Sequence, residues 1–302
     1  MSGNQYKACV VGLGSMGMGA ARSCIAAGLA TYGVDLNPAA CESLQGAGAV
    51  ASGADAAGFA GELDGVLLLV VNAEQCRGAL FGPEGLAPRL RPGTGVMVSA
   101  TISAADAREI AGRLEGMGLL VLDAPVSGGA AKAAAGEMTV MAAGSRAAFD
   151  RLRPLLDAVA GKVYEIGEEI GLGATVKIVH QLLAGVHIAA GAEAMALAAR
   201  AGIPLGTMYE VVTHAAGNSW MFENRMKQVV EGDYTPHSAV DIFVKDLRLV
   251  TETALALNFP LPLASTAYGM FANASNAGHG READAAVIRT FAGIRLPGDD
   301  GK

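Results

Sequence analysis

Residues 8–17 read Ala-Cys-Val-Val-Gly-Leu-Gly-Ser-Met-Gly, a short apolar run followed at once by glycines in the spacing Gly-x-Gly-x-x-Gly. This order predicts a β-strand, a tight turn at Gly12 and a helix that begins near Ser15. The next predicted strand, residues 31–34, is followed by Asp35. In such a unit the second glycine lets the backbone approach a pyrophosphate, the third lets the helix pack on the strand, and the acid accepts a ribose hydroxyl. A chain with 41 glycines contains glycine triplets by chance, but strand, helix and acid together predict a dinucleotide site.

The composition limits the fold and the class of partner. Hydrophobic residues make up 52% of the 302 residues and charged residues only 17%, so the chain can bury a large core in one large or two ordinary domains. The formal net charge of -7 argues against a general nucleic-acid binder, because no basic stripe is available to neutralise phosphates. A small anionic substrate is compatible with this charge, since a few side chains determine the charge of a pocket.

Nothing in the sequence points to export or to a membrane. The 4 cysteines all lie in the first quarter of the chain, without the spacing of a metal or redox motif, and are expected to be buried thiols in a reducing compartment. The segment before the first strand lacks the long apolar stretch of a signal peptide. No uninterrupted apolar run approaches the roughly 18–20 residues that span a bilayer. We therefore expect a cytoplasmic protein without a membrane partner.

Short strands alternate with helices up to about residue 166. Residues 65–71 form a continuous apolar run, which is typical of a central parallel strand covered on both faces. Further strands are predicted at 96–99, 119–123, 138–142 and 163–165, with helices at 74–81, 104–117 and 146–159. This alternation predicts an α/β fold, a Rossmann domain with an open, largely parallel sheet and right-handed crossovers.

The pattern changes in the second half of the chain. Residues 174–201 form one long alanine-rich stretch without proline, too long for an ordinary surface helix. Every later segment has helical periodicity, at 205–215, 220–231, 239–257, 263–274 and 283–291. We expect an N-terminal Rossmann domain over 1–167, a long interdomain helix over 168–201, and an all-α domain for substrate binding and oligomerisation over 202–302.

Polar residues follow the strands of the predicted sheet, at the edge where open parallel sheets bind ligands. Asn72 and Thr101 follow the third and fourth strands, and each is equally compatible with a cofactor contact and with a turn or helix N-cap. After the fifth strand, Ser127-Gly128-Gly129 offers consecutive backbone N–H groups and a hydroxyl, which predicts a site for a carboxylate. A flexible loop is the alternative.

The long helix contains the candidate reactive group. Lys177, His180 and Gln181 share one face, because they are separated by three and four positions. Gly171 and Gly173, just upstream, leave room for close approach of another segment. Lys177 is either a surface residue with a buried stem or a functional amine. Burial and a neighbouring nicotinamide cation would both lower the pKa of its ammonium toward a value suited to proton transfer.

Other candidates have ordinary alternatives. His180 and His187 lie seven positions apart, but no third ligand accompanies them, so we predict no metal site. Lys245 and Asp246 are typical of an exposed ion pair in an apolar helix. Trp220, the only tryptophan, is more typical of a core residue than of a pocket.

These motifs resemble those of the β-hydroxyacid dehydrogenase family, which includes 3-hydroxyisobutyrate, tartronate-semialdehyde and 6-phosphogluconate-type enzymes. The resemblance covers nearly the whole chain and depends on four motifs in order: residues 12–17, residues 123–129, the Gly-x-Gly-x-x-x-Lys segment that ends at Lys177, and Lys245-Asp246-Leu247. It implies the architecture already predicted and an oxidoreductase that uses NAD. It also implies a homodimer or homotetramer.

The resemblance implies roles for individual residues. Lys177 would be the catalytic acid/base, and Ser127, Gly128 and Gly129 would bind the substrate carboxylate. Further substrate contacts would come from His180, Gln181, Trp220 and Asn224. In the family, two asparagines usually occupy the positions of His180 and Gln181. The cofactor contacts would be Gly12, Leu13, Gly14, Ser15, Met16, Gly17, Asp35, Val71, Asn72, Thr101 and Lys245.

Asp35 predicts NAD rather than NADP, since a carboxylate accepts the free ribose 2′-hydroxyl and repels a 2′-phosphate. Residues 177–190 and 217–225 look most like the branch of the family that oxidises the C2 hydroxyl of L-threonate, a four-carbon sugar acid, to 2-oxo-tetronate. A polyhydroxylated acid suits the hydrogen-bonding side chains of His180, Gln181, Ser219 and Asn224.

Two alternatives stay open at this point. The chain could reduce a small semialdehyde, such as tartronate or succinic semialdehyde, with NAD(P)H, or it could oxidise 3-hydroxyisobutyrate. It could also be a non-catalytic dinucleotide-binding module, but such a module would be expected to lack Lys177, which is present.

Overall fold

The computed structural model of the protein describes residues 5–298. The chain forms two compact units, unit 1 (Met1–Lys177) and unit 2 (Ile178–Lys302). The first four residues, which the signal-peptide expectation includes, lie outside the described residues. The predicted division into 1–167, 168–201 and 202–302 treats the long helix as a separate part and stays a prediction.

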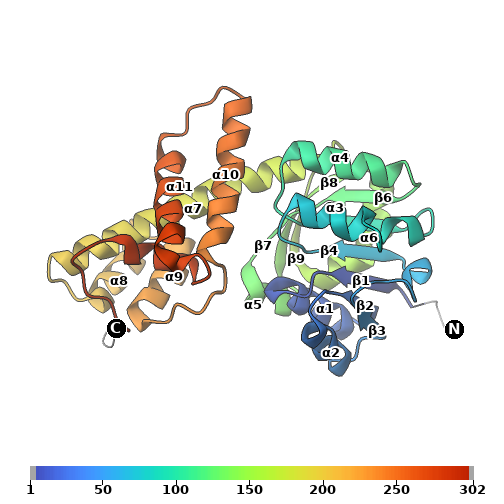
Figure 1. Ribbon diagram of the computed structural model, residues 1–302, viewed down its shortest axis with the longest axis horizontal. Coiled ribbons are helices and arrows are strands. Elements are labelled where there is room, and N and C mark those ends of the chain that lie inside the picture. The colour runs from blue at the N-terminus through green and yellow to red at the C-terminus, as the bar shows by residue number, and fades with distance from the viewer. Residues whose placement is uncertain (1–4, 299–302) are drawn as a thin grey trace. The chain divides into compact units, whose positions relative to one another are not determined.

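Unit 1 is a sheet covered by helices (Figure 1). Its strands are β1 (Lys7–Val11), β2 (Ala30–Val34), β3 (Ala51–Gly53), β4 (Gly65–Leu68), β5 (Gly95–Val98), β6 (Leu120–Asp123), β7 (Val126–Ser127), β8 (Met138–Gly144) and β9 (Ala160–Gly167). Its α-helices are α1 (Ser15–Ala26), α2 (Pro38–Gly46), α3 (Ala73–Phe81), α4 (Ala104–Glu115), α5 (Gly129–Ala134) and α6 (Arg146–Val159), and two short 3₁₀ helices are η1 (Ala60–Glu62) and η2 (Ala87–Arg89).

The strand order confirms the predicted open, largely parallel sheet. The order is β3-β2-β1-β4-β5-β6-β8-β7, and β9 pairs with β8. All neighbours from β3 to β6 are parallel, as are β8 and β9, whereas β8 runs antiparallel to β6 and β7. The chain reverses its direction of sheet growth between β1 and β4, which is where such sheets bind ligands. The strand predicted over 65–71 is shorter and ends at Leu68.

Side-chain alternation along the strands produces a core on each face of the sheet. In β1, Cys9 and Val11 join one cluster with side chains of α3 and α4, whereas Ala8 and Val10 join a second cluster with side chains of α1 and α6. The described cysteines are all buried thiols outside any disulfide, as predicted. Burial on both faces explains why β4 and β5 read as continuous apolar runs.

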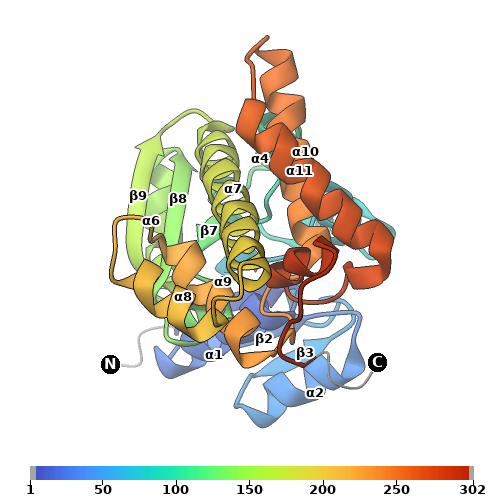
Figure 2. The ribbon, with the colours of Figure 1, turned by 90° about the vertical axis from the view of Figure 1, so that its left-hand side faces the viewer.

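Unit 2 is helical, and Figure 2 shows its ribbons from a second side. Its elements are α8 (Leu205–Thr213), α9 (Trp220–Glu231), α10 (Val240–Ala256), α11 (Pro262–Ala274), the π-helical turn η3 (Ser275–His279) and the 3₁₀ helix η4 (Asp284–Thr290). The long helix α7 (Leu172–Arg200) begins in unit 1 and continues through unit 2. The α-helix predicted over 283–291 is wrong in type: its buried, small residues form tighter 3₁₀ turns between α9, α10 and α11.

Helix α7 is the only described helix that is long and apolar enough to cross a bilayer. Half of its most apolar stretch is buried within the protein. The core helix of a soluble protein can have the same length and apolar composition. Its length therefore carries little weight as evidence for a membrane segment.

One buried ion pair joins two elements of unit 2. Arg225 Nε of α9 lies 2.7 Å from Asp284 Oδ1 at the start of η4, and their side chains are 13% and 0% exposed. Burial raises the pKa of Asp284, and the nearby guanidinium opposes this shift. Removing one partner of such a pair leaves an uncompensated buried charge.

We expect Asp284→Ala to lower the free energy of unfolding by about 3–5 kcal/mol, because it leaves the Arg225 guanidinium unpaired. Urea denaturation followed by the fluorescence of the single tryptophan, Trp220 of unit 2, measures this change. Asp150→Ala is the control, since Asp150 pairs with Arg146 on the surface of α6, and it should change the free energy by at most about 0.5 kcal/mol. Equal effects of the two substitutions would contradict a structural role for the buried pair.

Candidate active site

The glycine turn after β1 is closed by direct backbone packing. Gly12 has a φ of +89°, and a Cβ there would lie 2.6 Å from the Leu69 carbonyl oxygen. A Cβ on Gly17 would lie 1.7 Å from the Gly12 carbonyl oxygen, so helix α1 can approach the turn only with glycine at this position. Gly14 differs from both, because a Cβ there would have no atom within 4 Å. The three glycines therefore have three different local geometries, and their contacts with the cofactor stay predictions.

Helix α1 begins at Ser15, as predicted, and no side chain caps its N-terminus at Gly14. Its first turn contains no acidic residue. The leading N–H groups of a helix have no partners within the helix, and together with the helix dipole they favour an anion. This end of α1 lies beside the β1–β4 switch point of the sheet.

The Asp35 carboxylate is bonded to the same turn. Its Oδ2 accepts a hydrogen bond from the Leu13 N–H at 2.6 Å, and its Oδ1 accepts one from the Asn37 N–H at 2.8 Å. These bonds hold the carboxylate beside the glycine turn, at the end of β2. The predicted position of an acid that recognises a ribose is thus occupied by an oriented side chain.

The residues after β4 and β5 take different local roles. Asn72 caps helix α3, because its side-chain oxygen accepts the Gln75 N–H at 2.8 Å, and Gln75 in turn accepts the Val71 N–H at 2.8 Å. Thr101 lies in the loop after β5, and Ser103, not Thr101, caps helix α4. The N-cap alternative therefore holds for Asn72, and cofactor contacts by Val71, Asn72 and Thr101 stay predictions.

The Ser127-Gly128-Gly129 segment leads from the short strand β7 into α5. Gly128 and Gly129 have φ values of +132° and +71°. A Cβ at Gly129 would have no atom within 4 Å. Both conformations favour glycine, and successive backbone N–H groups in a turn can bind an anion.

A buried carboxylate attaches the start of helix α7 to the sheet. Asp123, at the end of β6, is only 2% exposed, and its Oδ2 accepts the N–H groups of Gly171 and Ala174 at 2.8 and 2.9 Å. A Cβ on Gly173 would lie 2.3 Å from the Asp123 carbonyl oxygen, which explains the glycine there. Burial raises the pKa of Asp123, and backbone hydrogen bonds from the helix oppose the shift.

This attachment fixes the position of the first turn of α7, the turn that precedes Lys177. Lys177 follows Ala174 by three residues and is 6% exposed, so the surface-residue alternative is wrong. Sequence reasoning identified Gly171 and Gly173 as room for close approach but missed Asp123 as the approaching group. The only signal was an acid at a strand end and a glycine pair about fifty residues later.

In unit 2, four of the singled-out side chains form one chain of contacts. Lys245 Nζ lies 2.6 Å from Asp246 Oδ1, Asp246 Oδ2 accepts Gln181 Nε2 at 2.5 Å, and Gln181 Oε1 lies 2.9 Å from His180 Nδ1. Asp246 is 2% exposed and the Lys245 side chain 15%. The expectation of an exposed ion pair is therefore wrong, because Asp246 faces α7 within the unit instead of solvent.

The predicted residues of helix α9 lie differently. Trp220 is 54% exposed, so the core alternative is wrong, and Phe222 occupies the core at this end of the helix. The Asn224 amide donates to the Trp220 carbonyl oxygen at 2.9 Å, and Ser219 caps the helix through the Phe222 N–H. Trp220 and Asn224 are accessible, and their substrate contacts stay predictions.

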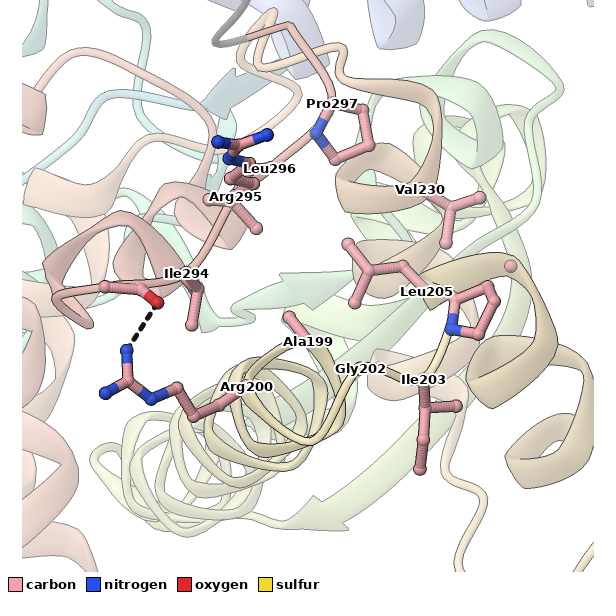
Figure 3. A pocket seen from close by; sticks show the side chains of 13 residues that line it. Ala199, Arg200, Gly202, Ile203, Leu205, Val230, Ile294, Arg295, Leu296 and Pro297 are labelled. Carbon is pink, nitrogen blue, oxygen red and sulfur yellow. Dashed lines mark hydrogen bonds between the residues drawn. The ribbon is translucent and has the colours of Figure 1, made fainter.

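A cavity of about 800 Å³ in unit 2 lies away from these residues (Figure 3). The side chains that line it come from the end of α7, the start of α8, α9 and the segment after η4, and they are mainly apolar apart from Arg200 and Arg295. The Arg200 guanidinium donates to the Gly293 carbonyl oxygen at 2.7 Å. None of the predicted site residues lines this cavity.

Among residues 5–298, no three side chains of His, Cys, Asp or Glu come together in a way that could hold a metal ion. His180 contacts Gln181, and His187 lies elsewhere along α7. The expectation of a metal-free site stays a prediction.

Both halves of the chain match models of known protein families. Residues 7–167 match the model for the NAD binding domain of 6-phosphogluconate dehydrogenase, and residues 171–291 match the model described as NAD-binding of NADP-dependent 3-hydroxyisobutyrate dehydrogenase. The chain is 69% identical to L-threonate dehydrogenase of Escherichia coli O6:H1, over 98% of each chain. It is 68% identical to L-threonate dehydrogenase of Haemophilus influenzae, over 98% of this chain and 99% of the relative.

A solved structure of similar sequence has the same fold. The crystal structure of 3-hydroxyisobutyrate dehydrogenase from Salmonella typhimurium is 67% identical and has a TM-score of 0.92, with 95% of this chain and 100% of that chain covered. The turn geometry of unit 1 fits the NAD that the matching domains bind. Gly14 leaves space for a close backbone approach, the α1 N-terminus is uncapped, and Asp35 is oriented beside the turn.

We expect Gly14→Ala to raise the Kd for NAD by at least about tenfold and to leave the melting temperature nearly unchanged, because its methyl group enters open space that the pyrophosphate needs. Gly17→Ala should instead lower the melting temperature, because its Cβ collides with the Gly12 carbonyl. NAD titration calorimetry and thermal melting measure the two effects. Gly46→Ala in α2, another site with no atom within 4 Å, is the control and should change neither. Wild-type NAD affinity in Gly14→Ala would remove this turn from the cofactor site.

Proposed function

Because this chain belongs to the 3-hydroxyisobutyrate dehydrogenase-like family of NAD-dependent hydroxyacid dehydrogenases, we propose that its substrate is L-threonate. The reaction would oxidise the C2 hydroxyl and yield 2-oxo-tetronate and NADH. The observation that carries the substrate assignment is the 68–70% identity to four L-threonate dehydrogenases over at least 97% of this chain.

The chemistry would centre on Lys177. Its neutral amine would take the proton from the C2 hydroxyl at Nζ, and the ammonium would return that proton in the reverse direction. When bound, NAD supplies the oxidant that accepts hydride from C2. The position of the amine depends on the first turn of α7, which Asp123 holds against β6.

The substrate carboxylate would bind at Ser127-Gly128-Gly129. The N–H groups of the two positive-φ glycines and the serine hydroxyl offer donors of the kind that a carboxylate accepts. Holding this carboxylate orients C2, and orientation of reacting groups accounts for much of the rate of such reactions.

The remaining assignments are also proposals. Gly12, Leu13, Gly14, Ser15, Met16, Gly17, Asp35, Val71, Asn72, Thr101 and Lys245 would contact NAD. His180, Gln181, Trp220 and Asn224 would contact the substrate. We further propose a cytoplasmic homodimer or homotetramer, which sedimentation equilibrium of the purified protein would measure.

The decisive experiment compares substrates. Steady-state rates with L-threonate and NAD are measured beside those with 3-hydroxyisobutyrate and NAD, and with succinic or tartronate semialdehyde and NADH. The proposal predicts the highest kcat/KM for L-threonate. A higher value for 3-hydroxyisobutyrate, the substrate named for the Salmonella structure, or for a semialdehyde would overturn the substrate assignment.

Lys177→Ala should lower kcat by about 10²–10⁴-fold, because the proton acceptor is lost, and should leave NAD affinity nearly intact. Stopped-flow rates of NADH formation and NAD titration measure the two properties. The matched control is Lys162→Ala, which removes an exposed lysine whose ammonium lies over the Tyr164 ring, and it should keep the wild-type rate. Near-normal turnover in Lys177→Ala would show that another group is the base.

Asp35→Arg should shift the ratio of kcat/KM for NAD to kcat/KM for NADP toward NADP by about 100-fold, or about 2.7 kcal/mol. The physical reason is that an arginine attracts the 2′-phosphate that the Asp35 carboxylate repels. The ratio is the appropriate measure, because the substitution also removes the acceptor of the Leu13 N–H and weakens both cofactors. Asp35→Asn, which removes the charge without adding a cation, should shift the ratio less. An unchanged ratio in Asp35→Arg would exclude a ribose-recognising role.

A further inference from the structure

The contacts among Lys245, Asp246, Gln181 and His180 have a defined hydrogen-bond direction. A carboxylate has no proton to donate, so the Gln181 atom that lies 2.5 Å from Asp246 Oδ2 must be the amide nitrogen. The Gln181 oxygen then faces His180 Nδ1 at 2.9 Å and can only accept. His180 Nδ1 must therefore bear a proton, and in the neutral imidazole the lone pair belongs to Nε2.

Burial makes the opposite direction costly. Gln181 is 7% exposed and Asp246 is 2% exposed. If the Gln181 amide turned over, its oxygen would face the Asp246 carboxylate, and two acceptors would meet without a proton in a site nearly closed to water. The Lys245 ammonium, 2.6 Å from the other carboxylate oxygen, is donor-only and keeps that oxygen an acceptor as well.

Close packing of the two helices holds this geometry. A Cβ on Gly185 of α7 would lie 2.8 Å from Leu247 Cδ2 of α10, so the helices approach closely one turn from Gln181 and next to Asp246. The side chains of Gln181 and Asp246 therefore meet where α7 and α10 pack closely. His180, which contacts Gln181 through Nδ1, is exposed.

We propose that Asp246 and Gln181 are positioning residues that hold His180 in the Nδ1-protonated tautomer, so that Nε2 accepts a hydrogen bond from a non-reacting hydroxyl of the substrate. The inference extends the proposed oxidation of L-threonate, whose C3 and C4 hydroxyls are such donors. It gives Gln181 a role through His180 besides the substrate contact proposed above. An acid with only hydrocarbon beyond C2 has no hydroxyl to donate a hydrogen bond to His180 Nε2 and would bind less well.

The tautomer is measured directly by NMR. Full-length protein with bound NAD is labelled with ¹⁵N-histidine, and the ring nitrogens are observed above the pH range in which imidazole titrates. His180→Asn assigns the His180 signals among the 5 histidines. The expected result is a protonated Nδ1 and an unprotonated Nε2. A protonated Nε2 in the wild-type protein would overturn the proposal.

Asp246→Asn makes the sharper test, because it should reverse the tautomer. The Lys245 ammonium would bind the new amide oxygen, and the amide nitrogen would then face Gln181. The Gln181 amide would turn over to accept this nitrogen's hydrogen bond, and its own nitrogen would donate to His180 Nδ1. A purely structural role for Asp246 would not exchange the protonated and unprotonated nitrogens. Should Asp246→Asn fail to fold, Gln181→Leu replaces it, and His180 should then populate both tautomers. Glu252→Gln is the matched control, since it removes an exposed carboxylate from the same helix and should leave the His180 signals unchanged.

The functional readout is the ratio of the kcat/KM values for two substrates. In wild-type protein we compare kcat/KM for L-threonate with that for 2-hydroxybutanoate of the same C2 configuration. Asp246→Asn should lower this preference by about tenfold, the size of one hydrogen bond, and Glu252→Gln should not change it. An unchanged preference after a reversed tautomer would overturn the specificity role. If the wild-type protein oxidises neither acid, the proposed function fails, and the tautomer measurement alone then decides the positioning role.

Discussion

The first turn of helix α7 depends on one buried carboxylate. Asp123 ends a central strand of the sheet and accepts two N–H groups that the helix cannot satisfy internally, those of Gly171 and Ala174. An acid at a helix N-terminus is also favoured by the helix dipole. Because Lys177 follows within one turn, the interaction that begins the helix also determines where the proposed base is held relative to the sheet of unit 1.

Several glycines allow elements of this protein to pack more closely than any other residue would. Gly17 lets α1 approach the turn after β1, Gly173 lets α7 approach β6, and Gly185 lets α7 approach α10. In each case a Cβ would lie under 3 Å from backbone or core atoms. Gly14 is the exception, because its missing side chain leaves open space. The same residue type thus serves packing at three places and the proposed ligand approach at a fourth.

Local patterns predicted most of the architecture. Apolar runs, glycine spacing and helical periodicity depend on neighbours within a few residues, and they correctly predicted the central strands, the start of α1 and the long helix. Features that depend on the surroundings were missed or wrong. Trp220 is exposed, whereas Phe222 occupies the core at that end of α9. The segment at 284–290, which packs against α9, α10 and α11, forms 3₁₀ turns.

The sequence by itself determined most of the elements, the glycine turn, the acid beside it and the identity of the proposed base. Only the tertiary structure decided which polar groups meet. Asp123 contacts residues 48 and 51 positions later, and Gln181 contacts Asp246 across 65 positions. No local pattern encodes such pairs. They form because a buried polar group must find a partner wherever the fold places one, and the partner in turn determines the direction of every hydrogen bond that follows.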